Sequence, residues 1–314
     1  MNLFVSLKYL VALDDQRHFG RAALACHVTQ PALSNALRAL EESFGTAIVK
    51  RGRNFAGFTP EGERVLVSAR TILREHELLQ QDLRSRADDP KGHLLIGTVP
   101  TAMPIAARFA AMLQARHPGI VPTLRSMSSV ALETGLESLA LDLGLGYTDR
   151  MGSRRAHLRL VPQYTERYFL LRKASRPATE SLQIGPPMTW SEAATLPLCL
   201  LSSEMHNRTI VDRAFVTAGA HPTPAIETNS ILALALTVVA GRVCSIMPGA
   251  LVGAVQGYRE LEALPLIGPL VETPVAFMVH DTDRHSRTLK AALTLAQDAS
   301  WLHEAGRHSG LLAG

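Results

Sequence analysis

The chain has 314 residues, a formal net charge of +4 at neutral pH, 46% hydrophobic residues and 19% charged residues. This composition is typical of globular proteins and excludes wholesale disorder and collagen-like repeats. Three cysteines at distant positions, without a CxxC pair, exclude a disulfide scaffold and argue against a zinc ribbon. At roughly 150 residues per domain, the length predicts about two domains.

The N-terminus and the apolar stretches predict where the protein works. The N-terminus has neither a basic segment nor a long apolar run, so we expect no signal peptide. The most apolar stretch, 231–241, is followed by Arg242 and is far shorter than the ~20 residues that cross a bilayer. We therefore expect a cytoplasmic protein with reduced thiols and no membrane partner. If it binds DNA, it is associated with the nucleoid.

Residues 1–45 show helical spacing of apolar residues in three segments. The third begins at Thr29, a suitable N-cap, and Pro31 is tolerated in a first helical turn. Its apolar face consists of Leu33, Leu37, Leu40 and Phe44. Its polar face consists of Pro31, Ser34, Asn35 and Arg38, beside Gln30. Arg pairs bidentately with guanine, and Asn or Gln with adenine, so this polar face suits the major groove of DNA.

Basic residues follow the third helix. Residues 46–59 alternate apolar and basic side chains, which predicts a small hairpin that carries Lys50, Arg51 and Arg53 as a phosphate-binding wing. Residues 1–59 are therefore predicted to form an all-α winged helix-turn-helix domain that binds double-stranded DNA. Its expected DNA contacts are Thr29, Gln30, Pro31, Ser34, Asn35, Arg38, Arg51 and Arg53. The alternative is a helical hairpin with a merely solvated polar face.

Residues 60–90 are predicted to form a long linker helix that dimerises the chain. Thr59-Pro60 provides its start and Asp88-Asp89-Pro90 its end. Seven residues alternate spacings of three and four: Gly62, Val65, Ala69, Ile72, His76, Leu79 and Leu83. This heptad seam predicts that the helix pairs with a second helix.

The sequence pattern changes after residue 91, where short apolar runs alternate with helical segments. The expected strands are 94–97, 121–125, 142–146, 168–172, 198–201, 243–247 and 275–279. The expected helices lie near 103–116, 129–140, 191–195, 207–219, 230–241 and 285–303. This alternation predicts α/β layers with mostly parallel sheets, long enough for two lobes.

Three runs of the sequence resemble the signature of one family. They are FGRAALACHVTQPALS at 19–34, LRALE at 37–41 and FTPEG at 58–62. On these runs the chain resembles the LysR-type transcriptional regulators, and the resemblance extends over nearly the whole chain. It implies a winged helix-turn-helix, a dimerising linker helix and an effector-binding domain over 91–304 with two Rossmann-like lobes, as in periplasmic binding proteins. The lobes would comprise about 91–162 with 268–304, and about 163–267.

The resemblance also implies a function. Such regulators are usually homotetramers that bind promoter DNA and respond to a small molecule, with RNA polymerase as a further candidate partner. For a regulator of this kind we expect no catalytic residue and no cofactor. We expect no metal site either: the sequence lacks HExxH, and His280 and His285 with Asp281 and Asp283 fit a strand-to-helix loop.

On this architecture, the effector cleft lies at strand ends and helix N-termini. Three stretches match: 99–103, 126–129 and 204–208. Their hydroxyl, amide and backbone N–H donors beside helix N-termini favour a small anion, typically a carboxylate. The expected effector residues are Thr101, Ala102, Ser128, Ser129, Tyr147, Asn207, Arg208, Asn229 and Pro248. Several have a plain alternative: Thr101, Ser128 and Asn207 as helix caps, Tyr147 as a packed aromatic, and Arg208 as a surface residue.

Other functions stay open. The DNA-binding half is similar to the peroxide-sensing branch of the family at 17–19 and 25–28, and that chemistry needs a reactive cysteine with a resolving partner. The stretch 202–207 has no cysteine, while Cys199 and Cys244 lie in apolar strands typical of inert core thiols. The stretches 200–204 and 227–231 look more like the cyanate-operon regulators, which hints at a very small anion such as cyanate or formate. A DNA-binding protein without an inducer, and a solute-binding module fused to a helical dimeriser, are the remaining alternatives.

Overall fold

The protein is described by a computed structural model, which covers residues 2–50, 52, 55–84, 89–150, 157–282 and 284–309. The chain forms two compact units that divide near Asp88. Arg51 and Arg53, predicted to lie in the wing, are outside the described residues. None of the described helices is both long and apolar enough to span a membrane.

The first unit is built from four helices around one apolar core. They are α1 (Leu3–Gln16), α2 (Phe19–Ala25), α3 (Gln30–Phe44) and α4 (Pro60–Arg84). Side-chain caps set the starts of α2 and α3. His18 Nδ1 accepts hydrogen bonds from the backbone N–H groups of Gly20 and Arg21, and Thr29 Oγ1 accepts one from Ala32. Gly45, with φ of 65°, ends α3 in the left-handed conformation that favours glycine.

Among the described residues, the predicted hairpin over residues 46–59 is seen as an antiparallel bridge between Val49 and Phe58. Hydrogen bonds from the Lys50 N–H to the Gly57 carbonyl and from the Thr59 N–H to the Ile48 carbonyl flank this bridge. One prediction about α3 was wrong. Phe44 does not complete the buried face of α3 but is 47% exposed, because it lies in the last turn and lines a shallow groove with Leu3 and Leu7. Leu33, Leu37 and Leu40 are buried as expected.

Helix α4 uses part of its heptad seam within its own unit. Val65 and Ala69 pack against the core of α1–α3, and a Cβ on Gly62 would meet the carbonyl oxygen of Ile48 at 2.1 Å. Buried Arg70 fixes α4 to α1 by donating to Asp14 Oδ2 and Asp15 Oδ1, each at 2.7 Å. Farther along α4, three apolar seam residues are exposed within this chain: Ile72, Leu79 and Leu83.

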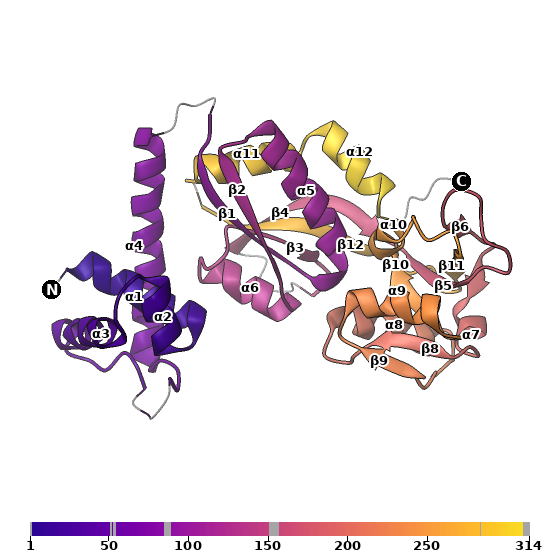
Figure 1. The fold of residues 1–314 in the computed structure, drawn as a ribbon, viewed down its shortest axis with the longest axis horizontal. Helices are drawn as coiled ribbons and strands as arrows, with labels where there is room; N and C mark the ends of the chain where they lie inside the picture. The colour runs from indigo at the N-terminus through magenta and orange to yellow at the C-terminus, as the bar shows by residue number, and fades with distance from the viewer. Residues whose placement is uncertain are drawn as a thin grey trace. The chain divides into compact units, whose positions relative to one another are not determined.

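The second unit has two lobes, each with its own sheet (Figure 1). Lobe 1 contains the strands β1 (Gly92–Thr98), β2 (Ile120–Ser126), β3 (Leu143–Tyr147), β4 (Leu158–Glu166) and β12 (Thr273–His280), in the order β2-β1-β3-β12-β4. Its helical segments are η1 (Pro100–Ala102), α5 (Met103–Arg116), α6 (Ser129–Glu137), α11 (Arg287–Ala296) and α12 (Ala299–Arg307).

Lobe 2 lies between the two lobe-1 segments in sequence. Its strands are β5 (Tyr168–Lys173), β6 (Gln183–Ile184), β7 (Met188–Thr189), β8 (Leu198–Leu201), β9 (Ile226–Thr228), β10 (Cys244–Pro248) and β11 (Leu261–Ile267). The order is β6-β11-β5-β10-β8-β9, with β7 paired to β11. Its helices are α7 (Trp190–Ala193), α8 (His206–Thr217), α9 (Ile231–Ala240) and α10 (Gly249–Ala254).

Both sheets are mixed: six of the ten strand pairings of the described residues are parallel, and the other four are antiparallel. Strand β12 runs antiparallel to β3 and β4, and β5 runs antiparallel to β10 and β11. The reason is that the chain changes lobe after β4 and again before β12, so β5 and β12 enter their sheets by direct crossings rather than through helices. Arg167 and Glu272 mark these crossings and form an ion pair at 2.7 Å.

Several elements differ from the sequence prediction. The expected helix at 285–303 is two helices, because Asp298 caps α12 by accepting from the backbone of Ser300 and Trp301. Strands β4 and β11 carry prolines and polar residues, and α10 is glycine-rich, so their apolar patterns are weak. Despite its few residues, α10 contacts α5 and η1 of lobe 1 and lies at the junction of the lobes (Figure 1).

Candidate functional site

Helix α3 presents the polar face that the sequence predicted for DNA. Gln30, Asn35 and Arg38 are exposed and Ser34 is half-buried, while the opposite face of α3 is buried in the core. Ser34, Arg38 and Lys50 line one hollow beside the helix. Among the described residues, Arg38 has no acidic partner, so its guanidinium is available to a polyanion.

Glu41 positions the basic segment relative to α3. Its Oε1 accepts hydrogen bonds from the backbone N–H groups of Ile48 and Val49, at 2.8 and 2.9 Å. These contacts hold the segment that begins at Ile48 beside the polar face of α3, next to Lys50. The buried side of α3 and the Glu41 contacts therefore orient its polar face independently of DNA.

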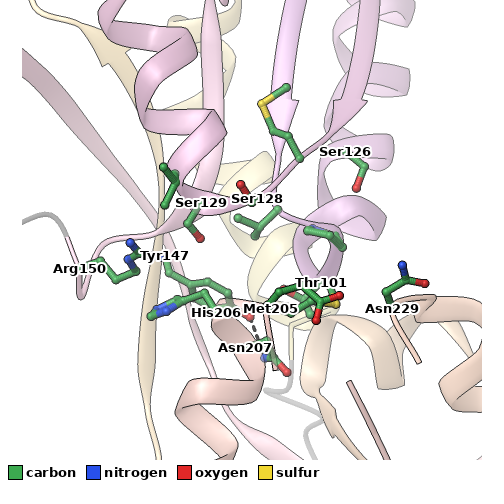
Figure 2. A pocket seen from close by; sticks show the side chains of 15 residues that line it. Thr101, Ser126, Ser128, Ser129, Tyr147, Arg150, Met205, His206, Asn207 and Asn229 are labelled. Atoms are coloured by element: carbon green, nitrogen blue, oxygen red, sulfur yellow. Dashed lines mark hydrogen bonds between the residues drawn. The ribbon is translucent and has the colours of Figure 1, made fainter. Parts of the chain in front are cut away.

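A second candidate site is a cavity of about 320 Å³ between the two lobes of the second unit (Figure 2). Lobe 1 contributes the ends of β1, β2 and β3 and the start of α6, and lobe 2 contributes the start of α8 and the loop after β9. The lining residues are Val99, Pro100, Thr101, Ser126, Met127, Ser128, Ser129, Val130, Tyr147, Arg150, Glu204, Met205, His206, Asn207 and Asn229.

The floor of this cavity is a hydrogen-bonded chain of neutral groups that crosses from one lobe to the other. The hydroxyls of Thr101 and Tyr147 are 2.7 Å apart. Asn207 Nδ2 donates to the Tyr147 hydroxyl at 3.0 Å and to the Tyr168 hydroxyl at 3.1 Å. Burial raises the pKa of Tyr147 well above the ordinary range, so its hydroxyl stays protonated. Every group in this chain therefore has a partner without any ligand.

A second lobe-to-lobe contact lies beside the floor. His206 Nε2 lies 3.0 and 3.1 Å from the two carboxylate oxygens of Asp149, which follows β3. The His206 ring also packs edge-on against Tyr147, with centroids 5.4 Å apart.

Two neighbouring serines at the start of α6 differ in their hydrogen bonding. Ser128 Oγ accepts from the backbone N–H of Ala131, which is the helix-capping role that was its plain alternative. Ser129 is only 5% exposed, and its Oγ has no hydrogen-bond partner among the described residues. Figure 2 shows this hydroxyl directed toward the row of side chains that includes Tyr147 and His206. A buried hydroxyl without a partner is costly, so Ser129 is a candidate for contact with a ligand in the cavity.

Six of the nine residues predicted for the effector line the cavity: Thr101, Ser128, Ser129, Tyr147, Asn207 and Asn229. Ala102, Arg208 and Pro248 do not. Ala102 is buried at the end of η1, and Pro248 precedes α10. The Arg208 guanidinium is occupied by the Asp212 and Glu227 carboxylates and the Leu201 carbonyl.

The sequence prediction missed Arg150, His206, Met127 and Met205 as lining residues. His206 and Met205 lie in a stretch that the sequence did single out, and their position beside Asn207 at the start of α8 was the available signal. Arg150 lies three residues after a strand end and carries no motif.

A buried carboxyl group lies where the chain first changes lobe. Glu166, the last residue of β4, is fully buried, and its Oε1 accepts from the backbone N–H of Ala250 at the start of α10. Burial raises the pKa of Glu166 to about 8, against the opposing effect of the Ala250 hydrogen bond. Its facing titratable groups are Tyr147, Tyr164 and Tyr168, whose pKa values are also raised by burial.

The cysteines of lobe 2 lie on opposite faces of its sheet. In the parallel pair β8–β10, Cys244 is opposite Leu198 and Ser245 is opposite Cys199. Since adjacent residues of a strand point to opposite faces, Cys199 and Cys244 point apart. Accordingly they pack in two different apolar clusters, and burial raises the pKa of both thiols. Neither lines the cavity.

Comparison with known proteins places the chain in a family. Residues 4–63 match the family described as bacterial regulatory helix-turn-helix protein, lysR family, and residues 87–301 match the LysR substrate binding domain. The chain therefore belongs to the LysR family of regulatory proteins, with both of its characteristic domains.

Similar proteins include activators named for peroxide. A hydrogen peroxide-inducible genes activator of Pectobacterium carotovorum subsp. carotovorum is 36% identical over 140 residues, 44% of this chain and 46% of that relative. The one from Haemophilus influenzae is 29% identical over 253 residues, 77% of this chain and 78% of that relative. The first match thus spans about half the length of the relative.

Solved structures show the same fold over the whole chain. Full-length OxyR from Pseudomonas aeruginosa, as a point variant, has a TM-score of 0.69 at 21% identity and covers 99% of each chain. CbnR in complex with its target DNA has a TM-score of 0.63 at 20% identity and covers 96% of this chain and 99% of that one. These likenesses confirm the winged helix-turn-helix and two-lobed architecture that the sequence predicted.

We predict that hydrogen peroxide does not link Cys199 to Cys244 in the folded protein. Thiols that point to opposite faces of a sheet cannot reach the short Cβ–Cβ separation of a disulfide without unfolding a strand. Non-reducing peptide mapping after peroxide treatment checks this, with urea-unfolded protein as the positive control. A reversible Cys199–Cys244 disulfide formed under native conditions would contradict it.

We predict that Glu166→Gln flattens the pH dependence of stability. The folded-state pKa of about 8 exceeds the ordinary value of 4.5, so the folded protein holds this proton more tightly. The contribution of Glu166 is therefore complete below about pH 4.5 and is lost as pH rises through about 8. Between about pH 5.5 and 7.5 the wild type should lose roughly 2 kcal/mol more unfolding free energy than the variant.

Urea unfolding at several pH values measures this difference. Glu180→Gln, at an exposed carboxyl group of lobe 2, is the matched control and should follow the wild-type slope. Parallel slopes for wild type and Glu166→Gln would show that Glu166 does not keep its proton.

Proposed function

We propose that this protein is a transcriptional regulator that binds promoter DNA through α3 and changes its DNA complex when a small anion occupies the cavity between its lobes. The observation that carries this proposal is the Ser129 hydroxyl, which is buried, is unpartnered among the described residues and belongs to a residue that lines the cavity at the start of a helix. The DNA-binding part of the proposal is supported separately by the exposed polar side chains on α3 of the helix-turn-helix.

The proposed DNA contacts are the residues predicted from the sequence. Gln30, Asn35 and Arg38 would read base edges in the major groove, with Thr29, Pro31 and Ser34 beside them. Lys50 would contact the phosphate backbone, together with Arg51 and Arg53, whose places lie outside the described residues. The exposure of the α3 polar face and the absence of an acidic partner for Arg38 within the described chain support this assignment.

The proposed assembly is a homotetramer built from dimers. The exposed apolar residues Ile72, Leu79 and Leu83 at heptad spacing on α4 support pairing with α4 of a second copy. A dimer would place two copies of α3 in successive major grooves of an inverted repeat. RNA polymerase is a further proposed partner at the promoter, and promoter binding would place the protein in the cytoplasm.

The chemistry of the cavity favours an anionic effector. Lobe 1 contributes the positive end of the α6 dipole, the Ser129 side chain and Arg150, and lobe 2 contributes His206 next to the carboxylate of Glu204. The two methionines, Val99 and Val130 supply apolar contacts. A cavity of about 320 Å³ suits a small molecule, so we propose a small carboxylate or a still smaller anion such as cyanate.

We predict that Arg38→Ala loses discrimination at one operator position. A bidentate contact to guanine accounts for about 1–3 kcal/mol of discrimination against the wrong base. Binding should be measured against the operator and against operators with single substitutions. If the variant instead weakens binding to all sequences equally, Arg38 contacts a phosphate and does not read bases.

We predict that Ser129→Ala loses the effector response while it retains operator binding. A hydrogen bond between Ser129 and a charged ligand contributes about 1.5–3 kcal/mol, so the effector concentration for half response should rise about tenfold or more. DNase I footprinting of the DNA next to the protein's own gene, with a panel of small carboxylates and cyanate, measures both properties.

Ser191→Ala is the control, because Ser191 lies in α7 and bonds the Ala218 carbonyl away from the cavity. A wild-type footprint that no anion changes would refute the effector proposal. The absence of any footprint would refute the DNA-binding proposal itself.

A further inference from the structure

The contact between His206 and Asp149 joins side chains from different lobes at the edge of the cavity. His206 opens α8 in lobe 2, and Asp149 follows β3 in lobe 1. The His206 side chain is 7% exposed and lines the cavity, whereas the Asp149 side chain is 29% exposed and can reach water. His206 Nε2 lies within hydrogen-bond distance of both carboxylate oxygens of Asp149.

Asp149 thus already supplies a carboxylate to a donor that faces the cavity. Burial raises the pKa of Asp149, but the hydrogen bond and electrostatic interaction with His206 lower it by more. The pKa therefore lies below its ordinary value, and the group is ionised. Arg208, two residues farther along α8, is held by Asp212 and Glu227. Among the described lining residues, His206 and Arg150 are therefore the groups through which this end of the cavity can attract an anion.

We propose that Asp149 is an internal carboxylate that holds His206 until an anionic effector takes its place. The inference rests on the proposed function, since it assumes that the cavity accepts an anion. The exchange keeps a partner on the largely buried His206, and it releases the carboxylate of the more exposed residue to water. That order avoids the large cost of leaving a buried polar group unpaired.

The exchange would also change how the lobes are held. It removes the His206–Asp149 contact between lobes and leaves the Asn207–Tyr147 bond of the cavity floor in place. A ligand shifts a conformational equilibrium only through different affinities for its two states. Competition with Asp149 supplies such a difference, because the anion binds best to the arrangement in which Asp149 has left His206.

Equilibrium dialysis of the full-length protein with radiolabelled acetate tests the exchange without DNA and without the natural effector. Asp149→Asn removes the competing charge at nearly constant volume. An attached competitor acts at an effective concentration of about millimolar or more, so acetate affinity should rise about tenfold or more. His206→Gln should abolish this binding. Asp212→Asn, on the same helix, is the matched control and should bind acetate as the wild type does.

Two results would overturn the proposal. One is acetate affinity in Asp149→Asn that is undetectable, equal to that of the wild type or weaker. The other is tighter binding in Asp149→Asn that persists in the double variant with His206→Gln, because acetate would then lie elsewhere. Asp149→Ala repeats the test if the asparagine variant does not fold, as judged by circular dichroism. A footprint indifferent to every anion would instead refute the proposed function, so the two failures are distinguishable.

Discussion

The Asn207 amide, placed between two tyrosine hydroxyls, is the interaction on which the second unit depends. Its Nδ2 joins Tyr147 of lobe 1 to Tyr168 of lobe 2, and all three side chains are buried. Buried polar groups are almost always hydrogen-bonded, so the loss of a hydrogen-bond partner is costly. The lobes are thus joined by a neutral network that needs no ligand. The His206–Asp149 contact and the unpartnered Ser129 hydroxyl belong to the same cavity but not to this network.

Glu166 extends this constraint to the point where the chain changes lobe. Its carboxyl group bonds the start of α10, and α10 contacts η1, which carries Thr101 of the cavity floor. A buried carboxyl that keeps its proton has less charge to desolvate than an ionised one. The junction between the lobes is therefore built from neutral groups, whereas the Arg167–Glu272 ion pair and the His206–Asp149 contact lie where water reaches at least one partner.

The sequence predicted the architecture because its main signals are local. The cap at Thr29, the apolar spacing of α3 and the alternating strands each occupy a few consecutive residues. The antiparallel placement of β5 and β12 was not predicted, because it depends on the two lobe crossings, which no local pattern records. Strands β4 and β11 were missed because prolines and polar residues interrupt their apolar pattern, although both pair with central strands of their sheets.

The cavity residues show the same contrast between local sequence signals and contacts that are distant in sequence. Strand ends and helix starts predicted Thr101, Ser129 and Asn207 as lining residues, since the ends of β1 and β2 and the start of α8 converge in this fold. Arg208 has the same apparent signal, one residue beyond Asn207. One position along a helix turns a side chain by about 100°, and this turn places Arg208 against Asp212 and Glu227 instead of the cavity. Hydrogen-bond partners distant in sequence decide which member of a motif faces the site.

The similarity to the hydrogen peroxide-inducible genes activators and to full-length OxyR is a similarity of sequence and fold. A shared fold carries different chemistries, and the site decides which one a chain performs. In this chain the start of α8 presents histidine and asparagine to the cavity, and both lobe-2 thiols are packed in apolar clusters on opposite faces of a sheet. A thiol that is desolvated and faces away from its only neighbour in the sheet is a poor nucleophile. Hydroxyl, amide and imidazole groups around a small cavity instead suit the reversible hydrogen bonding that we propose for an effector.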